Sequence, residues 1–370
     1  MRILMTTDTV GGVWTYTREL ATGLLAAGCN LTMVTLGRIP SDDQQAWIES
    51  TASRWLGSFR AVATDFRLEW MQDNAQVYSS SCRFMLDCVR EFVPDLIHSN
   101  QFCYGALPVD IPKLVVAHSD VLSWWRQCRD TEPDDSEWLV NYRSMVQRGL
   151  RGTDLLIAPT RWMLDQIEIG YGDLAPGAVI PNGRDISLIP DRPRRMQAVT
   201  AGRLWDEGKN IAMLAHVSSP IPILIAGDKC FDGAYAGFLD NASVAQLGHL
   251  TEEDLLHLLA ESSIYIVTSR YEPFGLAAVE AALCGCAILA NDIPPLREVW
   301  GDAAIYFDLN SSGSLANLLR QLAAEPAKVR ALAARAQNRA RKRFTRERMA
   351  AEYLGFYRQL LTQESSLHAA

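Results

Sequence analysis

Short apolar runs alternate with amphipathic stretches along the first half of the chain. The run RILMTTD at 2–8 is followed by Gly11-Gly12 and by an amphipathic stretch at 13–28 that ends at a glycine. A second helix is predicted within 75–92. Further apolar runs with few polar positions lie at 31–37, 59–65, 94–100, 113–120 and 153–160. Because strands that helices cover on both faces are apolar throughout, this pattern predicts a parallel, doubly wound sheet.

The pattern changes at 181–196, where Asn-Gly, three prolines and several charges predict a linker. A second alternation of strands and helices then begins, and the chain is predicted to be helical from about 311 onward. The predicted strands of this half lie at 197–204, 221–228, 242–250, 264–269, the last part of 269–290, and 303–308. The chain therefore predicts an α/β fold with three parts: Rossmann-like domains at 1–185 and 186–345, and a C-terminal helix at 346–370.

Two such domains joined by a linker predict a cleft between facing carboxyl ends of strands, where ligands bind in open parallel sheets. Polar residues in loops after strands are therefore the candidates for chemistry. The first strand–glycine–helix unit reads TVGGVWTY and lacks the GxGxxG spacing, so it predicts no dinucleotide fingerprint. Gly11 and Gly12 still allow a helix N-terminus to approach a phosphate closely.

The segment EPFGLAAVE places Glu272 and Glu280 eight residues apart in an otherwise apolar stretch. A helix is predicted to start near Leu276, with Gly275 before it, so that the backbone N–H groups of Phe274, Gly275 and Leu276 form an anion site. Carboxylates beside such a site make sense if they bind hydroxyls, and a nucleotide sugar supplies both phosphates and hydroxyls. The alternative is that Glu272 is only a helix N-terminal charge and Glu280 an exposed helix residue.

Two cations and a histidine follow other predicted strands. Arg203 and Lys209 lie six residues apart in GRLWDEGKN, and together they can neutralise a diphosphate. The alternative is a pair of solvated loop charges. His118 ends the strand in VVAHSD, where a hydrogen-bonded structural role is the alternative to a role at the ligand.

Charge and cysteine content narrow the class of protein. The net charge is −8, and the first 185 residues hold 16 Lys and Arg against 23 Asp and Glu. This balance disfavours nucleic acid and anionic membranes as partners. No apolar run is long enough for a transmembrane helix, and the N-terminus reads as a strand instead of a signal peptide. The eight cysteines show no metal-ligand spacing, and a reduced, cytoplasmic compartment is expected.

In their order along the chain, these motifs resemble glycosyltransferase family 4, the retaining GT-B glycosyltransferases. The two glutamates of EPFGLAAVE match the E-x7-E motif of that family, and the resemblance extends over nearly all of the 370 residues. It implies a GT-B fold with a final helix that crosses back onto the N-terminal domain. It also implies a retaining hexosyltransferase that needs no metal and no cofactor.

The resemblance implies a role for each candidate residue. Glu280 is expected to bind the ribose of the donor, and Glu272 the transferred sugar, helped by the amides of residues 274–276. Arg203 and Lys209 are expected to stabilise the diphosphate leaving group. Gly12 is expected near the donor phosphates or the acceptor, and His118 over the donor sugar.

The resemblance implies a UDP- or GDP-linked hexose as donor and a saccharide or small-molecule acceptor. A soluble acceptor is expected because the N-terminal domain is acidic. The chain departs from the family pattern at Arg184 in PNGRD, where a small apolar residue is common. Trp124 and Trp125 lie in the segment expected on the acceptor side, where they could stack on a sugar or pack in the core.

Two other classes share this fold. A GT-B-type sugar-nucleotide epimerase would need an acid/base set in the cleft, which the sequence does not offer. A non-catalytic nucleotide-sugar-binding protein would keep the fold and the binding residues, and binding without turnover would identify it.

Overall fold

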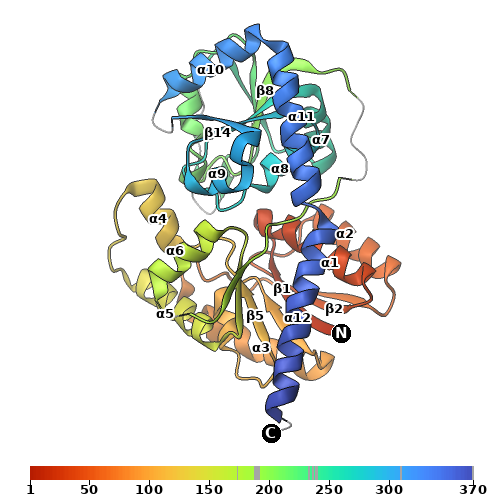
Figure 1. Ribbon diagram of the computed structural model, residues 1–370. Helices are drawn as coiled ribbons and strands as arrows, with labels where there is room; N and C mark the ends of the chain where they lie inside the picture. Colours follow the sequence, from red (N-terminus) through yellow and green to blue (C-terminus); the bar gives the residue numbers. More distant parts are fainter. Residues whose placement is uncertain are drawn as a thin grey trace. The chain divides into compact units, whose positions relative to one another are not determined.

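The computed structural model describes residues 1–172, 174–186, 192–231, 234–235, 237, 241–308 and 311–368. The chain divides into two compact units. Unit 1 comprises 1–126, 131–183 and 346–370, and unit 2 comprises 127–130 and 184–345. Each unit is built on one parallel sheet, which confirms the predicted pair of doubly wound sheets (Figure 1).

The sheet of unit 1 has seven strands in the order β3-β2-β1-β4-β5-β6-β7, and all neighbouring pairs are parallel. Its strands are β1 (Arg2–Asp8), β2 (Asn30–Leu36), β3 (Phe59–Ala63), β4 (Leu96–Ser99), β5 (Lys113–Val116), β6 (Leu155–Ala158) and β7 (Gly177–Val179). The helices that pack with it are α1 (Gly12–Ala26), α2 (Asp42–Arg54), α3 (Val77–Phe92), α4 (Val121–Arg129), α5 (Glu137–Gly152) and α6 (Arg161–Tyr171). The strands β1, β2, β4 and β6 are buried except at Arg2 and Asn30, the first residues of β1 and β2, as their apolar sequences predict.

The last helix, α12 (Arg346–His368), belongs to unit 1 and packs against α1, so the predicted return of the chain to the N-terminal part is confirmed (Figure 1). Small residues permit the close approach, because a Cβ added at Gly23 would lie 2.6 Å from Ala350 Cβ. An ion pair between Arg346 Nε and Glu19 Oε2, 2.6 Å apart, also joins the two helices.

The main sheet of unit 2 has six parallel strands in the order β12-β9-β8-β13-β14-β15. They are β8 (Arg195–Ala201), β9 (Ile223–Ala226), β12 (Val244–Gly248), β13 (Ser262–Val267), β14 (Ala287–Asn291) and β15 (Ala304–Phe307). The helices are α7 (Glu252–Glu261), α8 (Leu276–Leu283), α9 (Pro294–Trp300), α10 (Ser312–Ala324) and α11 (Pro326–Arg343). A short antiparallel hairpin joins β10 (Cys230–Phe231) to β11 (Ala234–Tyr235).

The core of unit 2 explains why the segment around the two glutamates is apolar. Helix α8 packs between α7, α11 and the sheet, and most of its alanine, valine and leucine side chains are buried. Ala336 and Ala340 of α11 are completely buried in the same cluster. Small side chains on both helices therefore bring α8 close to the sheet and set the position of its N-terminus.

The stretch NIAMLAHVSS at 210–219 predicts a helix from its sequence, and this prediction is wrong. The segment forms only a short 3₁₀ helix at Ile211–His216. The Asn241 side chain explains the difference, because its Nδ2 donates to the carbonyl oxygens of Leu214, Ala215 and Val217 at 2.9–3.2 Å. These carbonyls are thereby satisfied outside an α-helix.

Among the residues that the structure describes, no helix is both long and apolar enough to span a bilayer.

Candidate donor site

The sequence predicts an anion site at the N-terminus of α8, and the structure shows the local backbone there. Gly275 precedes the helix in the left-handed conformation, with φ 88°, which favours glycine. Within the part of the chain that the structure describes, the backbone N–H groups of Phe274, Gly275 and Leu276 have no hydrogen-bond acceptor. Unsatisfied N–H groups at a helix start attract phosphate and carboxylate groups. The structure therefore brings these three predicted residues together.

Glu272 lies in the loop before α8 and pairs with Lys209. Lys209 Nζ is 2.6 Å from Glu272 Oε2, and Ser269 Oγ donates to the same oxygen at 2.8 Å. Both charged side chains are largely buried, with exposed fractions of 20% for Lys209 and 13% for Glu272. Lys209 is therefore held against the predicted sugar-binding carboxylate, a pairing that spans 63 residues of sequence.

Further bonds join the two loops that carry this pair. Thr268 Oγ1 donates to Lys209 O at 2.7 Å, and Arg270 N donates to Gly208 O at 2.8 Å. The loops meet because β8 and β13 are neighbours in the sheet, so that their carboxyl ends lie at the same edge. The position of the pair is therefore set by the sheet.

Asn291 supports the loop from a third strand, and sequence reasoning missed it. It ends β14, and its Nδ2 donates to Thr268 O and, at 3.0 Å, to Ser269 O. Its Oδ1 is buried and has no partner among the described residues. A polar residue at the end of the apolar run AILAN is the signal that could have identified it.

Glu280 lies one turn inside α8 and is not an exposed helix residue. Its side chain is 13% exposed, and its Oε1 accepts a hydrogen bond of 2.8 Å from Arg184 Nε. Glu272 and Glu280 share a neighbour: burial raises the pKa of Tyr265 above its ordinary value, and both carboxylates add to the rise. Both glutamates of the motif therefore affect the pKa of Tyr265, Glu272 from the loop before α8 and Glu280 from within the helix.

Arg203 follows β8 on the same loop as Lys209. Its Nη2 lies 2.7 Å from Asp206 Oδ2, and its guanidinium lies 5.4 Å from the ring centroid of Trp205. The side chain is 40% exposed, so it keeps surface through which a ligand could reach it. Each predicted cation therefore already has a carboxylate partner, which the sequence did not predict.

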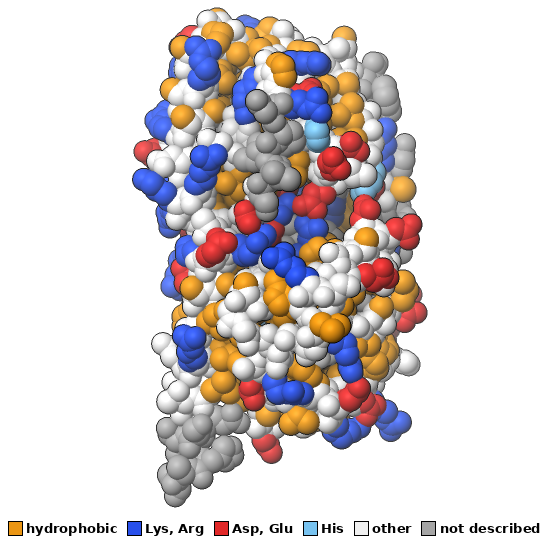
Figure 2. Space-filling model, turned by 90° about the vertical axis from the view of Figure 1, so that its right-hand side faces the viewer, with side chains coloured by type: hydrophobic (Ala, Val, Ile, Leu, Met, Phe, Trp, Pro, Cys, Tyr) orange, Lys and Arg blue, Asp and Glu red, His pale blue; other side chains and the backbone are white. Residues whose placement is uncertain are grey.

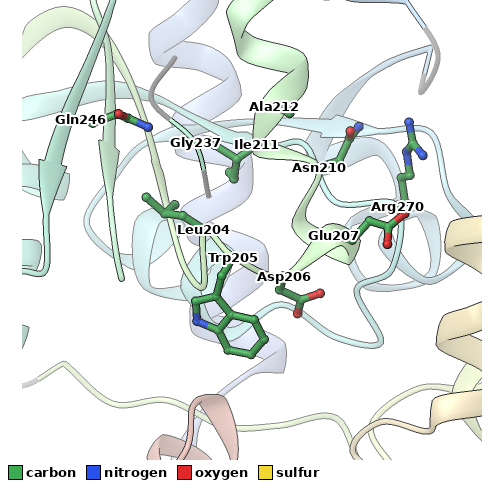
Figure 3. Close-up of a pocket in the computed structure, with 10 residues that line it drawn as sticks. All are labelled: Leu204, Trp205, Asp206, Glu207, Asn210, Ile211, Ala212, Gly237, Gln246 and Arg270. Carbon is green, nitrogen blue, oxygen red and sulfur yellow. The ribbon is translucent and has the colours of Figure 1, made fainter. Parts of the chain in front are cut away.

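A pocket of about 360 Å³ lies beside this loop in unit 2. Figure 3 shows the residues that line it, which are 204–207, 210–212, Gly237, Gln246 of β12 and Arg270. Lys209 belongs to the same loop, but none of the predicted site residues is among the described residues that line the pocket. The pocket adjoins the donor candidates without containing them.

His118 follows β5 in unit 1, and its Nε2 lies 2.8 Å from Asn100 Oδ1. The orientation of this amide is fixed, because its other polar atom lies 2.7 Å from Thr6 O, which can only accept. That atom is therefore Nδ2, and Oδ1 faces the imidazole. His118 Nε2 must then carry the hydrogen, and Nδ1 is left as an acceptor.

Burial, and to a smaller extent the neighbouring His98, lowers the pKa of His118 to about 3. Burial likewise lowers the pKa of His98 to about 3, and its Nδ1 lies 2.7 Å from the Tyr357 hydroxyl on α12. The Tyr16 ring packs against His118 with a centroid distance of 4.4 Å. His118 is therefore neutral at physiological pH and held in place by unit 1.

The predicted glycines of unit 1 lie at the start of α1, and its predicted tryptophans lie on α4. Gly11 precedes α1 with φ 120°, and apart from its chain neighbours and the backbone of its own helix, no described atom lies within 4 Å of a Cβ added at Gly12. The surface at Gly12 is therefore open to an approaching group. Trp124 and Trp125 lie on α4, with ring centroids 6.2 Å apart.

Two family profiles match successive parts of the chain. "Glycosyltransferase Family 4" matches residues 10–188, and "Glycosyl transferases group 1" matches residues 211–343. The chain belongs to glycosyltransferase family 4. The resemblance deduced from the E-x7-E motif is thereby confirmed.

Several named proteins are similar to this family 4 glycosyltransferase. It is 27% identical to "Glycogen synthase" from Mycobacterium tuberculosis, over 92% of this chain and 90% of that protein. It is 24% identical to "Alpha-maltose-1-phosphate synthase" from Mycolicibacterium smegmatis, over 72% and 79%. A segment covering 21% of each chain is 35% identical to "O-antigen chain mannosyltransferase B" from Escherichia coli.

Solved structures show the GT-B fold of the glycosyltransferase. Sucrose-phosphate synthase from Thermosynechococcus elongatus superposes with a TM-score of 0.77 at 20% identity, over 98% of this chain and 100% of that one. Anabaena HepE, solved with UDP and glucose, superposes with a TM-score of 0.73 at 20% identity, over 97% and 100%.

On the face that Figure 2 draws, Lys and Arg side chains are interspersed with Asp and Glu, in line with the absence of a basic net charge.

Proposed function

We propose that this glycosyltransferase moves a hexose from a nucleotide-diphosphate sugar to an acceptor hydroxyl, with retention of the anomeric configuration. The observation that carries the proposal is the surroundings of the α8 N-terminus. Three N–H groups without acceptors among the described residues lie beside the Lys209–Glu272 pair and one turn from Glu280. Such a site offers donors to phosphates and acceptors to hydroxyls, the two kinds of group that a nucleotide sugar presents.

The donor diphosphate would bind the N–H groups of residues 274–276, with Lys209 and Arg203 as its cations. Lys209 has three donor hydrogens, so it can bind a phosphate while it keeps its bond to Glu272. Glu280 would accept from the ribose hydroxyls. Glu272 would accept from a hydroxyl of the transferred sugar, and its bonds to Lys209 and Ser269 fix its orientation.

The reaction needs one bond exchange at the anomeric carbon. The bond from that carbon to the leaving phosphate oxygen breaks, and a bond to the acceptor oxygen forms on the same face of the sugar. The acceptor proton passes to the departing phosphate. Catalysis then rests on positioning and on stabilising the charge of the diphosphate, so Lys209 and Arg203 carry the electrostatic part. Glu272 is not proposed as a nucleophile, because this exchange needs no covalent intermediate on the protein. Lys209 and Ser269 bind its Oε2, and Oε1 is the oxygen proposed to accept from the sugar hydroxyl.

UDP- and GDP-linked hexoses are the proposed donors, and UDP-glucose is the first to test. One related structure is titled as a complex with UDP-glucose, and the named relatives include a glycogen synthase and mannosyltransferases. The proposed acceptor is a saccharide or small molecule. The roles of Gly11, Gly12 and His118 near the donor remain predictions for unit 1.

Thermal unfolding with UDP, GDP, ADP and their glucose and mannose conjugates tests the donor site. A ligand at a hundred times its Kd adds about 2.7 kcal/mol to the free energy of unfolding. We expect one nucleotide family to stabilise the wild type and to lose this effect in Glu280→Gln. Glu325→Gln, on a half-exposed surface pair with Lys328, is the matched control and should bind normally.

If no nucleotide stabilises the wild type, the proposed donor site is wrong. Binding of a nucleotide sugar without transfer to any acceptor would instead identify a sensor, and interconversion of the sugar without an acceptor would identify an epimerase.

A further inference from the structure

Arg184 is a buried cation in the segment PNGRD. At this position the chain departs from the family pattern, in which a small apolar residue is common. Its side chain is only 5% exposed. The backbone fixes it, because Arg184 N donates to Phe344 O at 2.9 Å, and Nη1 donates to Asp185 O at 3.0 Å. The guanidinium therefore has little surface left for a ligand, and any effect on a ligand must pass through its neighbours.

Two carboxylates bind this guanidinium, and they differ in burial. Nε donates to Glu280 Oε1 at 2.8 Å, and Nη2 pairs with Glu252 Oε1 at the start of α7. The Glu252 side chain is 47% exposed, whereas that of Glu280 is 13% exposed. The buried contact is therefore the one to the glutamate that we assign to the ribose.

Stability alone does not explain a buried ion pair, because replacing such a pair by apolar side chains is often neutral or stabilising. Arg184 can serve binding in two ways. The directional Nε–H bond restricts the Glu280 carboxylate to one orientation. The positive charge also offsets the repulsion between Glu280 and a diphosphate bound at the α8 N-terminus.

We propose that Arg184 is a positioning residue that orients Glu280 for the ribose hydroxyls and so makes the site selective for ribonucleotides over deoxyribonucleotides. The proposal rests on the proposed function, which assigns Glu280 to the ribose. It extends that function by adding a residue outside the E-x7-E motif that determines how the sugar of the nucleotide is distinguished.

Isothermal titration calorimetry measures this selectivity directly. UDP, GDP and ADP are titrated into the wild type, and the one that binds is compared with its 2′-deoxy and 3′-deoxy forms. We expect the wild type to prefer the ribonucleotide by about tenfold or more, as for hydrogen bonds to a charged acceptor. Arg184→Met should lose most of this preference.

Three further proteins separate the causes. Arg184→Lys keeps the charge without the Nε donor, so it should retain more affinity for the diphosphate than Arg184→Met but still lose the ribose preference. Glu252→Gln removes the exposed partner and should keep the preference within about twofold. In a Glu280→Gln background, Arg184→Met should cause no further loss of preference, because both changes act on one interaction.

The outcomes distinguish this inference from the proposed function. If a diphosphate binds the wild type with a ribose preference that both folded Arg184 variants retain, the positioning role is wrong and the donor site stands. A further loss of preference when Arg184→Met is added to Glu280→Gln would also refute it. If none of the three diphosphates binds the wild type, the donor site itself is wrong, and the inference is refuted with it.

Discussion

Lys209→Ala removes the cation that we place at the leaving diphosphate. In the structure, Lys209 Nζ lies 2.6 Å from Glu272 Oε2, and the lysine side chain is 20% exposed. Two unit charges about 4 Å apart interact by about 4 kcal/mol at an effective dielectric constant of about 20. Loss of one preorganised donor typically raises the barrier by about 2.7–4 kcal/mol. We therefore expect kcat to fall by about a hundredfold or more.

The assay is release of nucleoside diphosphate at saturating donor, with circular dichroism to establish that each variant is folded. Lys328→Ala is the matched control, because Lys328 also pairs with a glutamate in unit 2 but is 46% exposed. It should leave kcat unchanged. Lys209→Arg keeps the charge and should recover part of the activity.

A second variant tests whether the fall in kcat comes from the missing cation or from the Glu272 carboxylate that Lys209→Ala leaves unpaired. Lys209→Ala leaves a charged Glu272 without its cation. The double variant, Lys209→Ala with Glu272→Gln, has no charged side chain at position 272. If the lysine stabilises the diphosphate, the double variant stays as slow as the single one. Recovery of the double variant, or a folded Lys209→Ala enzyme with kcat within about threefold of wild type, would refute the reasoning.

Two further predictions concern unit 1. Gly23→Ala places a Cβ 2.6 Å from Ala350 Cβ and should destabilise the protein by about 1–3 kcal/mol in urea denaturation. Gly355→Ala, whose Cβ meets no described atom within 4 Å, should stabilise α12 by up to about 1 kcal/mol; equal effects would contradict the docking of α12 on α1. Because burial lowers the pKa of His118 to about 3, its imidazole should not titrate in the kcat profile between about pH 5.5 and 8.5. Asn100→Asp favours the imidazolium and raises this pKa, so activity should fall as the pH decreases through the raised value; a profile like that of the wild type would contradict the contact between Asn100 and His118.

Much of the donor site could be predicted from one short segment. The helix predicted to start near Leu276 begins at that residue in the structure, with Glu272 before it and Glu280 one turn inside it. Local signals were sufficient here: a proline and a glycine precede a run of good helix formers.

The partners of the charged residues could not be predicted, because they depend on sheet order. Lys209 contacts Glu272 only because β8 and β13 are neighbours in the main sheet. Along the chain, two other strands of that sheet, β9 and β12, lie between them. Arg184 and Glu280 are 96 residues apart, and the atypical arginine of PNGRD carried no information about its partner. Asn100 and Asn291 were missed for the same reason, since each binds a residue that follows another strand: Asn100 contacts His118 after β5, and Asn291 contacts Ser269 after β13.

The most direct test of the central claim is NMR observation of the purified protein with UDP-glucose, GDP-mannose and a panel of saccharide acceptors. The account predicts that one donor is consumed only when a suitable acceptor is present. The nucleoside diphosphate should be released, and the new glycosidic bond should have the anomeric configuration of the donor. A product of inverted configuration would contradict the proposed reaction. If every donor stays intact with every acceptor and binds no more tightly to the wild type than to Glu280→Gln, the assignment of the α8 N-terminus to a nucleotide sugar is contradicted as well.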